Sequence, residues 1–192
     1  GPAFLVGSIG AGVFGSARLG VGLYIIHVIA AAITGLFFRV DGKCRGNAPA
    51  APRESGGALI ESVRQAAQSI LSVCGFIVCF CVIIGLLDAH GMFSLLAGQL
   101  AQITGLELHA ARAALSGFLE LGSGIGAMRG LAVSPANLAI AAGIVGWGGV
   151  SVHFQTYAVL ADSDIKGGLH LAGRLINCAV SATLGYIFGL LL

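Results

Sequence analysis

The sequence predicts an all-α fold, a polytopic integral membrane protein whose helical bundle contains broken or re-entrant helices. Hydrophobic residues make up 57% of the 192-residue chain and charged residues only 9%, against roughly 25% charged residues in soluble domains. The mean hydropathy is +0.96, and several uncharged stretches approach the roughly 20 residues that a transmembrane helix needs. Glycine supplies 31 residues without a collagen-like period, which favours closely packed or interrupted helices. A water-soluble globular protein is therefore excluded.

The chain is expected to form a single membrane domain. It starts at Gly1 rather than at methionine and has no signal-peptide n-region, so we expect it to be a fragment that lacks an N-terminal part. The domain divides into three parts: a re-entrant segment plus the first span (1–40), a cytoplasmic loop (41–57), and an interfacial helix followed by spans and broken helices (58–192).

The first apolar run, 3–16, is shorter than a full span. Small residues such as Gly7, Gly12 and Gly15 allow helix backbones to approach closely, so this run predicts a re-entrant hairpin or a helix packed inside a bundle. Residues 19–38 carry no formal charge and predict the first full transmembrane helix.

The loop is the one stretch of soluble character. Half of the ten basic residues of the chain fall between positions 39 and 64. Because cytoplasmic loops of membrane proteins are enriched in Lys and Arg, loop 39–64 is expected in the cytoplasm of a bacterial cell, with the chain crossing the cell membrane several times.

After the loop, an amphipathic pattern predicts an interfacial helix over 58–68, and the uncharged run 69–87 predicts a span that ends at a polar interface cluster around Asp88. The run 92–106 is shorter than a transmembrane helix needs to be and is expected to be half-buried or re-entrant in the membrane. The glycines of 122–126 predict a helix break, because each glycine in a helix interior costs about 1 kcal/mol relative to alanine.

Ser134-Pro135 predicts a helix start, with serine as the N-cap and proline in the first turn. From there to Ala161 no residue is charged, which is too long for one straight span. The glycines Gly146, Gly148 and Gly149 should interrupt this stretch, and 168–192 should form the last span.

A weak internal similarity links two glycine-rich runs, G-S-I-G-A-G-V-F-G at 7–15 and G-I-V-G-W-G-G-V-S at 143–151, each followed by a span. Two related repeats are common in transporters. Shared composition is the alternative explanation.

Glu120 is the strongest single indication of function. A carboxylate at membrane depth is costly and normally faces a cavity, a partner or an ion. It directly precedes the predicted glycine break, where freed backbone groups can themselves bind ions. Arg129 is a candidate counter-charge, and Ser123 is the nearest hydroxyl. The alternative is that Glu120 lies near an interface and is simply hydrated.

The second indication is the alternation of apolar and polar residues over 150–155. A period of two is typical of extended chain. Ser151, His153 and Gln155 would then point to one side and line an enclosed cavity, where they suit a neutral polar solute or an ion. In the alternative, a helix, Ser151 and Gln155 share a face and His153 turns away.

Two further polar residues lie in apolar spans. Arg174 and Asn177 are three residues apart and share a helix face that could reach a cavity, whereas His27 is expected to be an ordinary buried histidine. We predict no catalytic residues, no metal site and no cofactor, because no motif for hydrolysis, phosphate binding or haem attachment occurs. The chain is not expected to be an enzyme or, lacking a basic run, to bind nucleic acid.

Five sequence runs carry a family resemblance: G-P-A-F-L-V-G-S-I-G-A-G-V-F-G, I-I-H-V-I-A-A-A-I-T-G-L-F-F-R, G-F-I-V-C-F-C-V-I-I, F-L-E-L-G-S-G and W-G-G-V-S-V-H-F-Q. Together they resemble the YlbJ-like sporulation integral membrane proteins of the nucleoside-recognition, or Gate, family. The resemblance covers nearly the whole chain. It implies the C-terminal half of a longer protein, needed for spore cortex formation in an endospore-forming bacterium.

Gate proteins are similar to concentrative nucleoside transporters, in which two re-entrant hairpins and adjacent broken helices build the solute and ion site. This similarity implies a site at Glu120, Ser151, His153 and Gln155, opposite the hairpin 7–15. The chain departs from the expected pattern in one respect, because Ser123 is the only hydroxyl residue soon after the acid.

Two functions follow as expectations. The first is a secondary transporter or permease for a small polar solute, with a coupling cation as an option. The alternative is a non-transporting membrane scaffold in spore-envelope assembly, in which the glycines serve helix packing alone. The expected partners are the lipid bilayer and the solute, and a homo-oligomer is left open.

Overall fold

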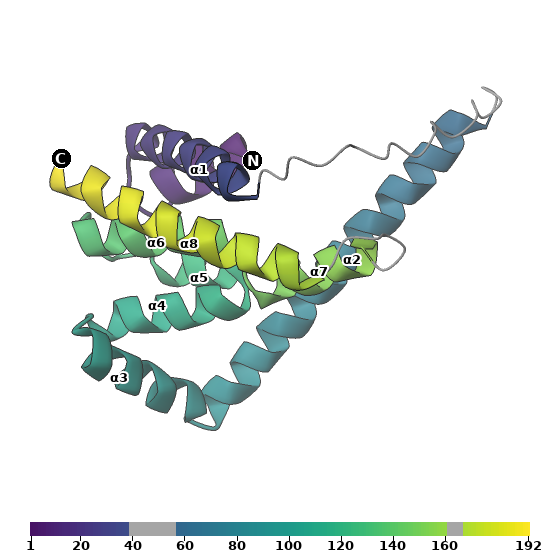
Figure 1. The fold of residues 1–192 in the computed structure, drawn as a ribbon. Helices are drawn as coiled ribbons and strands as arrows, with labels where there is room; N and C mark the ends of the chain where they lie inside the picture. The colour runs from purple at the N-terminus through teal and green to yellow at the C-terminus, as the bar shows by residue number, and fades with distance from the viewer. Residues whose placement is uncertain (39–56, 161–166) are drawn as a thin grey trace.

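The computed structural model describes residues 1–38, 57–160 and 167–192, and every regular element in these ranges is a helix (Figure 1). The all-α prediction is confirmed for this part of the chain. The predicted cytoplasmic loop falls, apart from its last residue, outside the described residues. The elements are η1 (Phe4–Ala11, a π-helix), α1 (Ala17–Phe37), α2 (Ala58–Ala89), α3 (Met92–Thr104), α4 (Leu108–Leu119), α5 (Leu121–Ala127), α6 (Pro135–Trp147), α7 (Val150–Leu160) and α8 (Gly167–Leu190).

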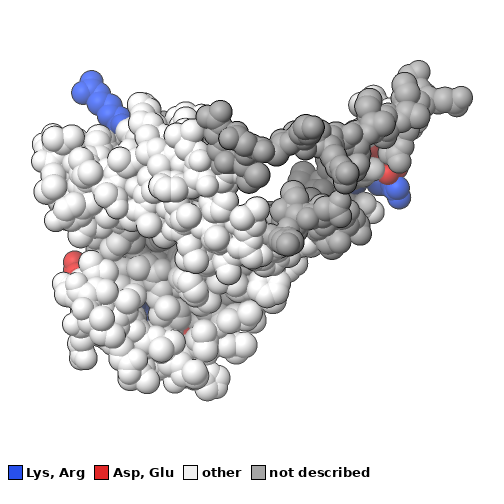
Figure 2. Space-filling model, viewed as in Figure 1, with Lys and Arg blue, Asp and Glu red and all other residues white. Residues whose placement is uncertain are grey.

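Within the described ranges, four helical stretches are long and apolar enough to cross a membrane: Ala17–Phe37, Ala58–Ala89, Pro135–Ala158 and Gly167–Leu190. The third comprises α6 and most of α7. At 1.5 Å per residue, the unbroken 24-residue helix Gly167–Leu190 reaches about 36 Å, enough for a hydrocarbon core of about 30 Å. Charged side chains are sparse on the face in Figure 2. Length and composition therefore indicate a multi-pass membrane protein.

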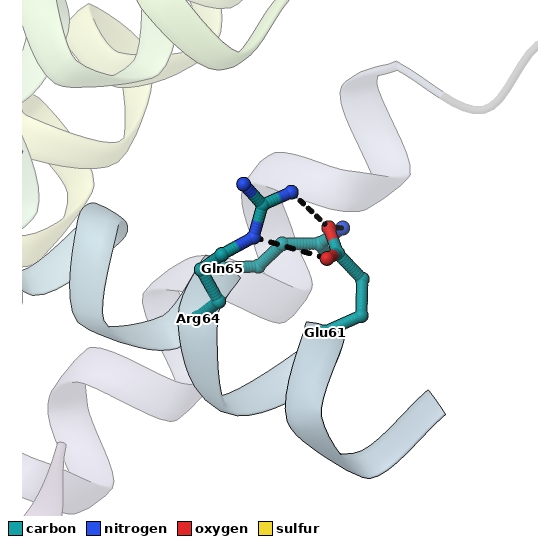
Figure 3. A network of polar contacts seen from close by, with 3 residues as sticks. All are labelled: Glu61, Arg64 and Gln65. Atoms are coloured by element: carbon teal, nitrogen blue, oxygen red, sulfur yellow. Dashed lines mark hydrogen bonds and ion pairs between the residues drawn. The ribbon is translucent and has the colours of Figure 1, made fainter. Parts of the chain in front are cut away.

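Helix α2 is one continuous helix of 32 residues that covers both the predicted interfacial helix and the predicted span. No proline or glycine interrupts residues 58–68, so the amphipathic pattern and the apolar pattern join without a break. Near its first turns, Glu61 accepts hydrogen bonds from Arg64 and Gln65 in an exposed network (Figure 3). Exposed charged and polar side chains of this kind suit a watery environment.

Helices α6 and α8 form the main packed pair and cross through glycines. A side chain at Gly185 would lie 2.8 Å from the carbonyl oxygen of Leu138, and one at Gly189 would lie 2.5 Å from the Cα of Pro135. Gly146 is held equally close to the backbone of α8. Small residues at a crossing bring helix backbones together, so Gly146, Gly185 and Gly189 act in packing.

Helix η1 and α1 form a tight hairpin at the N-terminus (Figure 1). The turn uses Gly15 at φ +66°, and the Ser16 amide donates to the carbonyl of Gly10 at 2.8 Å. A side chain at Gly10 would lie 2.6 Å from the Cα of Gly20. The hairpin is therefore packed through Gly10 and Gly20.

The predicted packing roles within this hairpin need correction. Gly7 is exposed, and a side chain there would meet no atom within 4 Å. A side chain at Gly12 would meet only the adjoining turn, 2.5 Å from the carbonyl of Ser8, and Gly15 serves the turn rather than a helix contact. The spacing of the glycines in the sequence does not show which face of η1 meets α1. In the structure this face carries Gly10 and not Gly7.

Helices α3 and α4 form a second hairpin beside α2 (Figure 1). Gly91 and Gly105, both at φ +72°, bound α3 at its two ends. Arg112 of α4 donates to Asp88 and to Ser94, each at 2.7 Å. The polar cluster predicted at Asp88 thus forms an exposed ion pair that ties α4 to the end of α2.

The α6–α8 crossing yields a direct test. Replacing a glycine by alanine inside a helix normally stabilises the helix, by up to about 1 kcal/mol. The substitution Gly185→Ala, however, places a methyl group against the backbone of α6. We expect this variant to lower the free energy of unfolding by about 1–3 kcal/mol. The measurement is equilibrium unfolding in mixed detergent micelles.

The matched control is Gly75→Ala, within α2, where the added methyl group meets nothing within 4 Å. This variant should leave the stability unchanged or raise it slightly. Equal effects of the two substitutions would show that the α6–α8 crossing is not as close as described.

Candidate functional site

The helical chain breaks at Glu120, between α4 and α5, where the backbone is extended (φ −142°, ψ 123°). The carboxylate then restarts the helix by accepting hydrogen bonds from the amides of Gly122 at 2.9 Å and Ser123 at 2.6 Å. The predicted break is thus present, but it lies at Glu120, and the glycines that follow are inside α5. Glu120 is only 4% exposed, so the hydrated alternative does not hold.

A second break separates α6 from α7 at Gly148 and Gly149, which have φ of +89° and +84°. Only glycine adopts this conformation without strain. The helix resumes at Val150, so the prediction of extended chain over 150–155 is wrong and the helical alternative holds. Polar residues fall on two faces of α7 because it packs against both α2 and α8.

The two breaks lie against each other. A side chain at Gly149 would come within 2.9 Å of the amide nitrogen of Leu121 and 3.2 Å of the Cα of Glu120. Two features therefore favour glycine at position 149: its φ is positive, and the neighbouring backbone leaves no room for a side chain. Helix α5 folds back along α4, with Gly124 facing the backbone of Gly117, so the turn at Glu120 meets the break between α6 and α7.

Side chains satisfy the backbone groups that the breaks set free. The Gly146 carbonyl, in the last turn of α6, accepts from Asn177 Nδ2 of α8 at 3.1 Å. The Phe118 carbonyl, in the last turn of α4, accepts from Trp147 Nε1 at 2.9 Å. The last carbonyls of a helix have no partner within it, so Asn177 and Trp147 stabilise the interrupted geometry.

Around the second break, α7 and α8 bring two histidines together. His153 Nδ1 lies 3.3 Å from His170 Nε2, and the His153 ring lies 4.2 Å from the Trp147 ring, centroid to centroid. In the described parts of the chain, no further His, Cys, Asp or Glu completes a metal-binding group of three.

This region also concentrates buried polar atoms that have no hydrogen-bond partner among the described residues. Such atoms are uncommon in folded proteins, and each needs an explanation. Ser151 is fully buried and His153 is 4% exposed. The unpartnered atoms are His27 Nδ1, Ser151 Oγ, His153 Nε2, Arg174 Nε and Ser181 Oγ, contributed by α1, α7 and α8.

Three predicted residues lie elsewhere. The hydroxyl of Ser123 faces Cys81 of α2, with the two side-chain atoms 3.4 Å apart. Gln155 lines a separate pocket of about 440 Å³ with polar residues of α2 such as Gln68. Arg129 is exposed and makes no ion pair among the described residues, so it does not neutralise Glu120.

Arg174 and His170 were not among the predicted site residues, although both lie at the second break. An arginine inside an apolar span is a signal that sequence reasoning could have weighted more heavily, because intramembrane charge is normally functional. His27 is not the satisfied buried histidine that was expected, since its Nδ1 is buried without a partner.

Comparison with known proteins adds no assignment. No protein-family model, curated protein or solved structure matches the chain. The resemblance to the Gate family therefore stays a prediction that rests on the quoted sequence runs.

The contact between the breaks can be tested at Gly149. Gly149→Ala combines the strain of a positive φ, about 1–2 kcal/mol, with a methyl group pressed against Leu121 and Glu120. We expect a loss of unfolding free energy larger by about 1–3 kcal/mol than that of Gly130→Ala. Gly130 has φ +87° and open space around it.

Both variants are measured by equilibrium unfolding in mixed detergent micelles. Because Gly130→Ala shares the strain but not the crowding, the difference isolates the contact. Equal losses in the two variants would argue that the breaks do not meet.

Proposed function

We propose that this chain is a Gate-family secondary transporter or permease that moves a small polar solute across a membrane. One observation carries the proposal: two helix interruptions pack on each other at Gly149, beside buried polar side chains. Broken helices that meet inside an apolar bundle are the usual construction of solute and ion sites in secondary transporters.

The depth of the second break supports this proposal. Gly148 lies thirteen residues after Pro135, in a stretch of 24 residues, or about 20 Å along it at 1.5 Å per residue. The break is therefore near the middle of the stretch. Non-helical backbone at that depth is tolerated only where protein or a watery cavity surrounds it.

Glu120 is the proposed coupling residue. Its two carboxylate oxygens each accept one backbone amide, which leaves a lone pair on each for a further partner. No basic side chain among the described residues pairs with it. A proton or a small cation would complete this environment. Because the Ser123 hydroxyl faces α2, it does not serve as a ligand in the described conformation.

The remaining features of the proposal rest on the sequence. The η1–α1 hairpin is assigned as re-entrant, and the runs 7–15 and 143–151 as parts of two related repeats. The protein is placed in the cell membrane of an endospore-forming bacterium, with residues 39–64, which include the first turns of α2, in the cytoplasm and with a role in spore cortex formation.

The proposal is tested first by finding the solute. Purified protein is screened by thermal shift against nucleosides, amino acids, carboxylates and divalent cations, because a ligand that binds only the folded state raises its melting temperature. Compounds that do so are then tested as radiolabelled solutes for uptake into proteoliposomes under proton and sodium gradients.

Glu120→Gln should abolish gradient-driven uptake while the protein remains folded, because glutamine keeps one cap acceptor but carries no charge. The control is Glu107→Gln, an exposed acid at the start of α4 whose side chain makes no cap hydrogen bond. The measurement is the initial uptake rate, expected to fall by at least about tenfold in the first variant and to stay unchanged in the second.

Undiminished uptake by Glu120→Gln would remove the coupling role. If no solute is moved and alanine at His153 and Gln155 leaves sporulation unchanged, the scaffold alternative is favoured.

A further inference from the structure

Arg174 of α8 carries a positive charge against the second helix break. A side chain at Gly148 would lie 2.5 Å from Arg174 Nη2, so the guanidinium packs on the bare backbone of the break. Its Nε is buried without an acceptor. Among the described residues, no carboxylate pairs with Arg174, whereas Arg64 and Arg112 each have an acidic partner.

The neighbours of Arg174 do not supply the missing negative charge. His27, His153 and His170 lie close enough to interact with it electrostatically, and all three are donors or neutral acceptors. Glu120, the nearest acid along the interrupted helices, packs on Gly149 and caps α5 instead. Arg174 is half-buried with its Nε fully buried, and a charge in such a place is unfavourable without a partner, so an anionic group beside it would be stabilising.

The start of α7 supplies a second, independent indication. This helix has eleven residues, and the first amides of a helix have no acceptor within it and favour anions. In its first turns, the fully buried Ser151 Oγ and the buried His153 Nε2 also have no partner. Unpartnered polar atoms of α7 and α8 therefore lie close to the break along the chain, and His153 is the one of α7 that lies near Arg174.

We propose that Arg174, with His153 near the start of α7, binds an oxyanion group, a carboxylate or a phosphate. The guanidinium fork matches such groups with two parallel hydrogen bonds. This inference rests on the proposed function, because the oxyanion group is assigned to the transported solute. The glycine pair then separates an anion side at Arg174 from a cation or proton side at Glu120.

The binding test uses Trp147, the one tryptophan of the chain, whose ring contacts His153. Purified protein in phosphatidylcholine nanodiscs is titrated with sodium phosphate and with sodium acetate at constant ionic strength, set with sodium chloride. A saturable change in fluorescence is expected with at least one of the two. Arg174→Gln should weaken that binding by at least about tenfold, and Arg174→Lys, which keeps the charge but loses the fork, should weaken it less.

The matched control is Arg112→Gln, because Arg112 is paired with Asp88 and lies away from the break. It should bind phosphate or acetate as the unmodified protein does. A stability measurement covers the case in which a variant folds poorly. Without the anion, Arg174→Met should melt at a higher temperature than the unmodified protein, and phosphate or acetate should no longer raise that temperature.

Nanodiscs containing phosphatidylglycerol distinguish the two sources of an oxyanion. If this lipid abolishes the response to free phosphate or acetate in the unmodified protein, the site holds a lipid headgroup; if the response persists, the site takes a soluble anion. No saturable response in either membrane, or binding that Arg174→Gln leaves unchanged, would overturn the proposal.

The outcomes separate this inference from the proposed function. Binding that depends on Arg174 without any solute uptake would leave the anion site standing and remove the transport function. Solute uptake that Arg174→Gln does not alter would leave the transport function standing and remove Arg174 as the site of the solute's oxyanion group.

Discussion

The backbone contact between Gly149 and the Glu120 break is the constraint on which the rest of the site depends. In an apolar bundle, peptide groups that leave a helix must find partners within the protein, because lipid offers none. The chain meets this requirement by bringing both interruptions to one place, where side chains of α6 and α8 reach the freed carbonyls. Close approach then requires glycine, since any side chain at 149 would meet the neighbouring backbone.

Much of the helical framework could be predicted from composition and local chemistry. Ser134 and Pro135 specify the start of α6, and both interruptions lie close to the positions that glycine and a buried acid indicated. These features depend on neighbours in the sequence, so they are visible without a structure. A change in amphipathic pattern does not by itself interrupt a helix, and the predicted interfacial helix and span accordingly form the continuous α2.

The arrangement of the polar site could not be predicted in the same way. The alternation of residues 150–155 indicated extended chain, but it arises because α7 lies between two neighbours and has polar side chains toward both. Gln155 lines a pocket with α2, whereas His153 contacts His170 of α8. The position of Arg174 over Gly148 is likewise a tertiary contact between distant segments. Nothing in the local sequence specifies such a pairing.

The indole of Trp147 fastens the end of α6 to the end of α4 through Phe118, and the two aromatic rings also stack, 5.4 Å apart between centroids. The segments before the two interruptions are thereby joined into one unit, whereas α5 and α7 begin beyond this fastening. The directions that α5 and α7 take are therefore set by the backbone at Glu120 and at the glycine pair, where the chain departs from helical geometry.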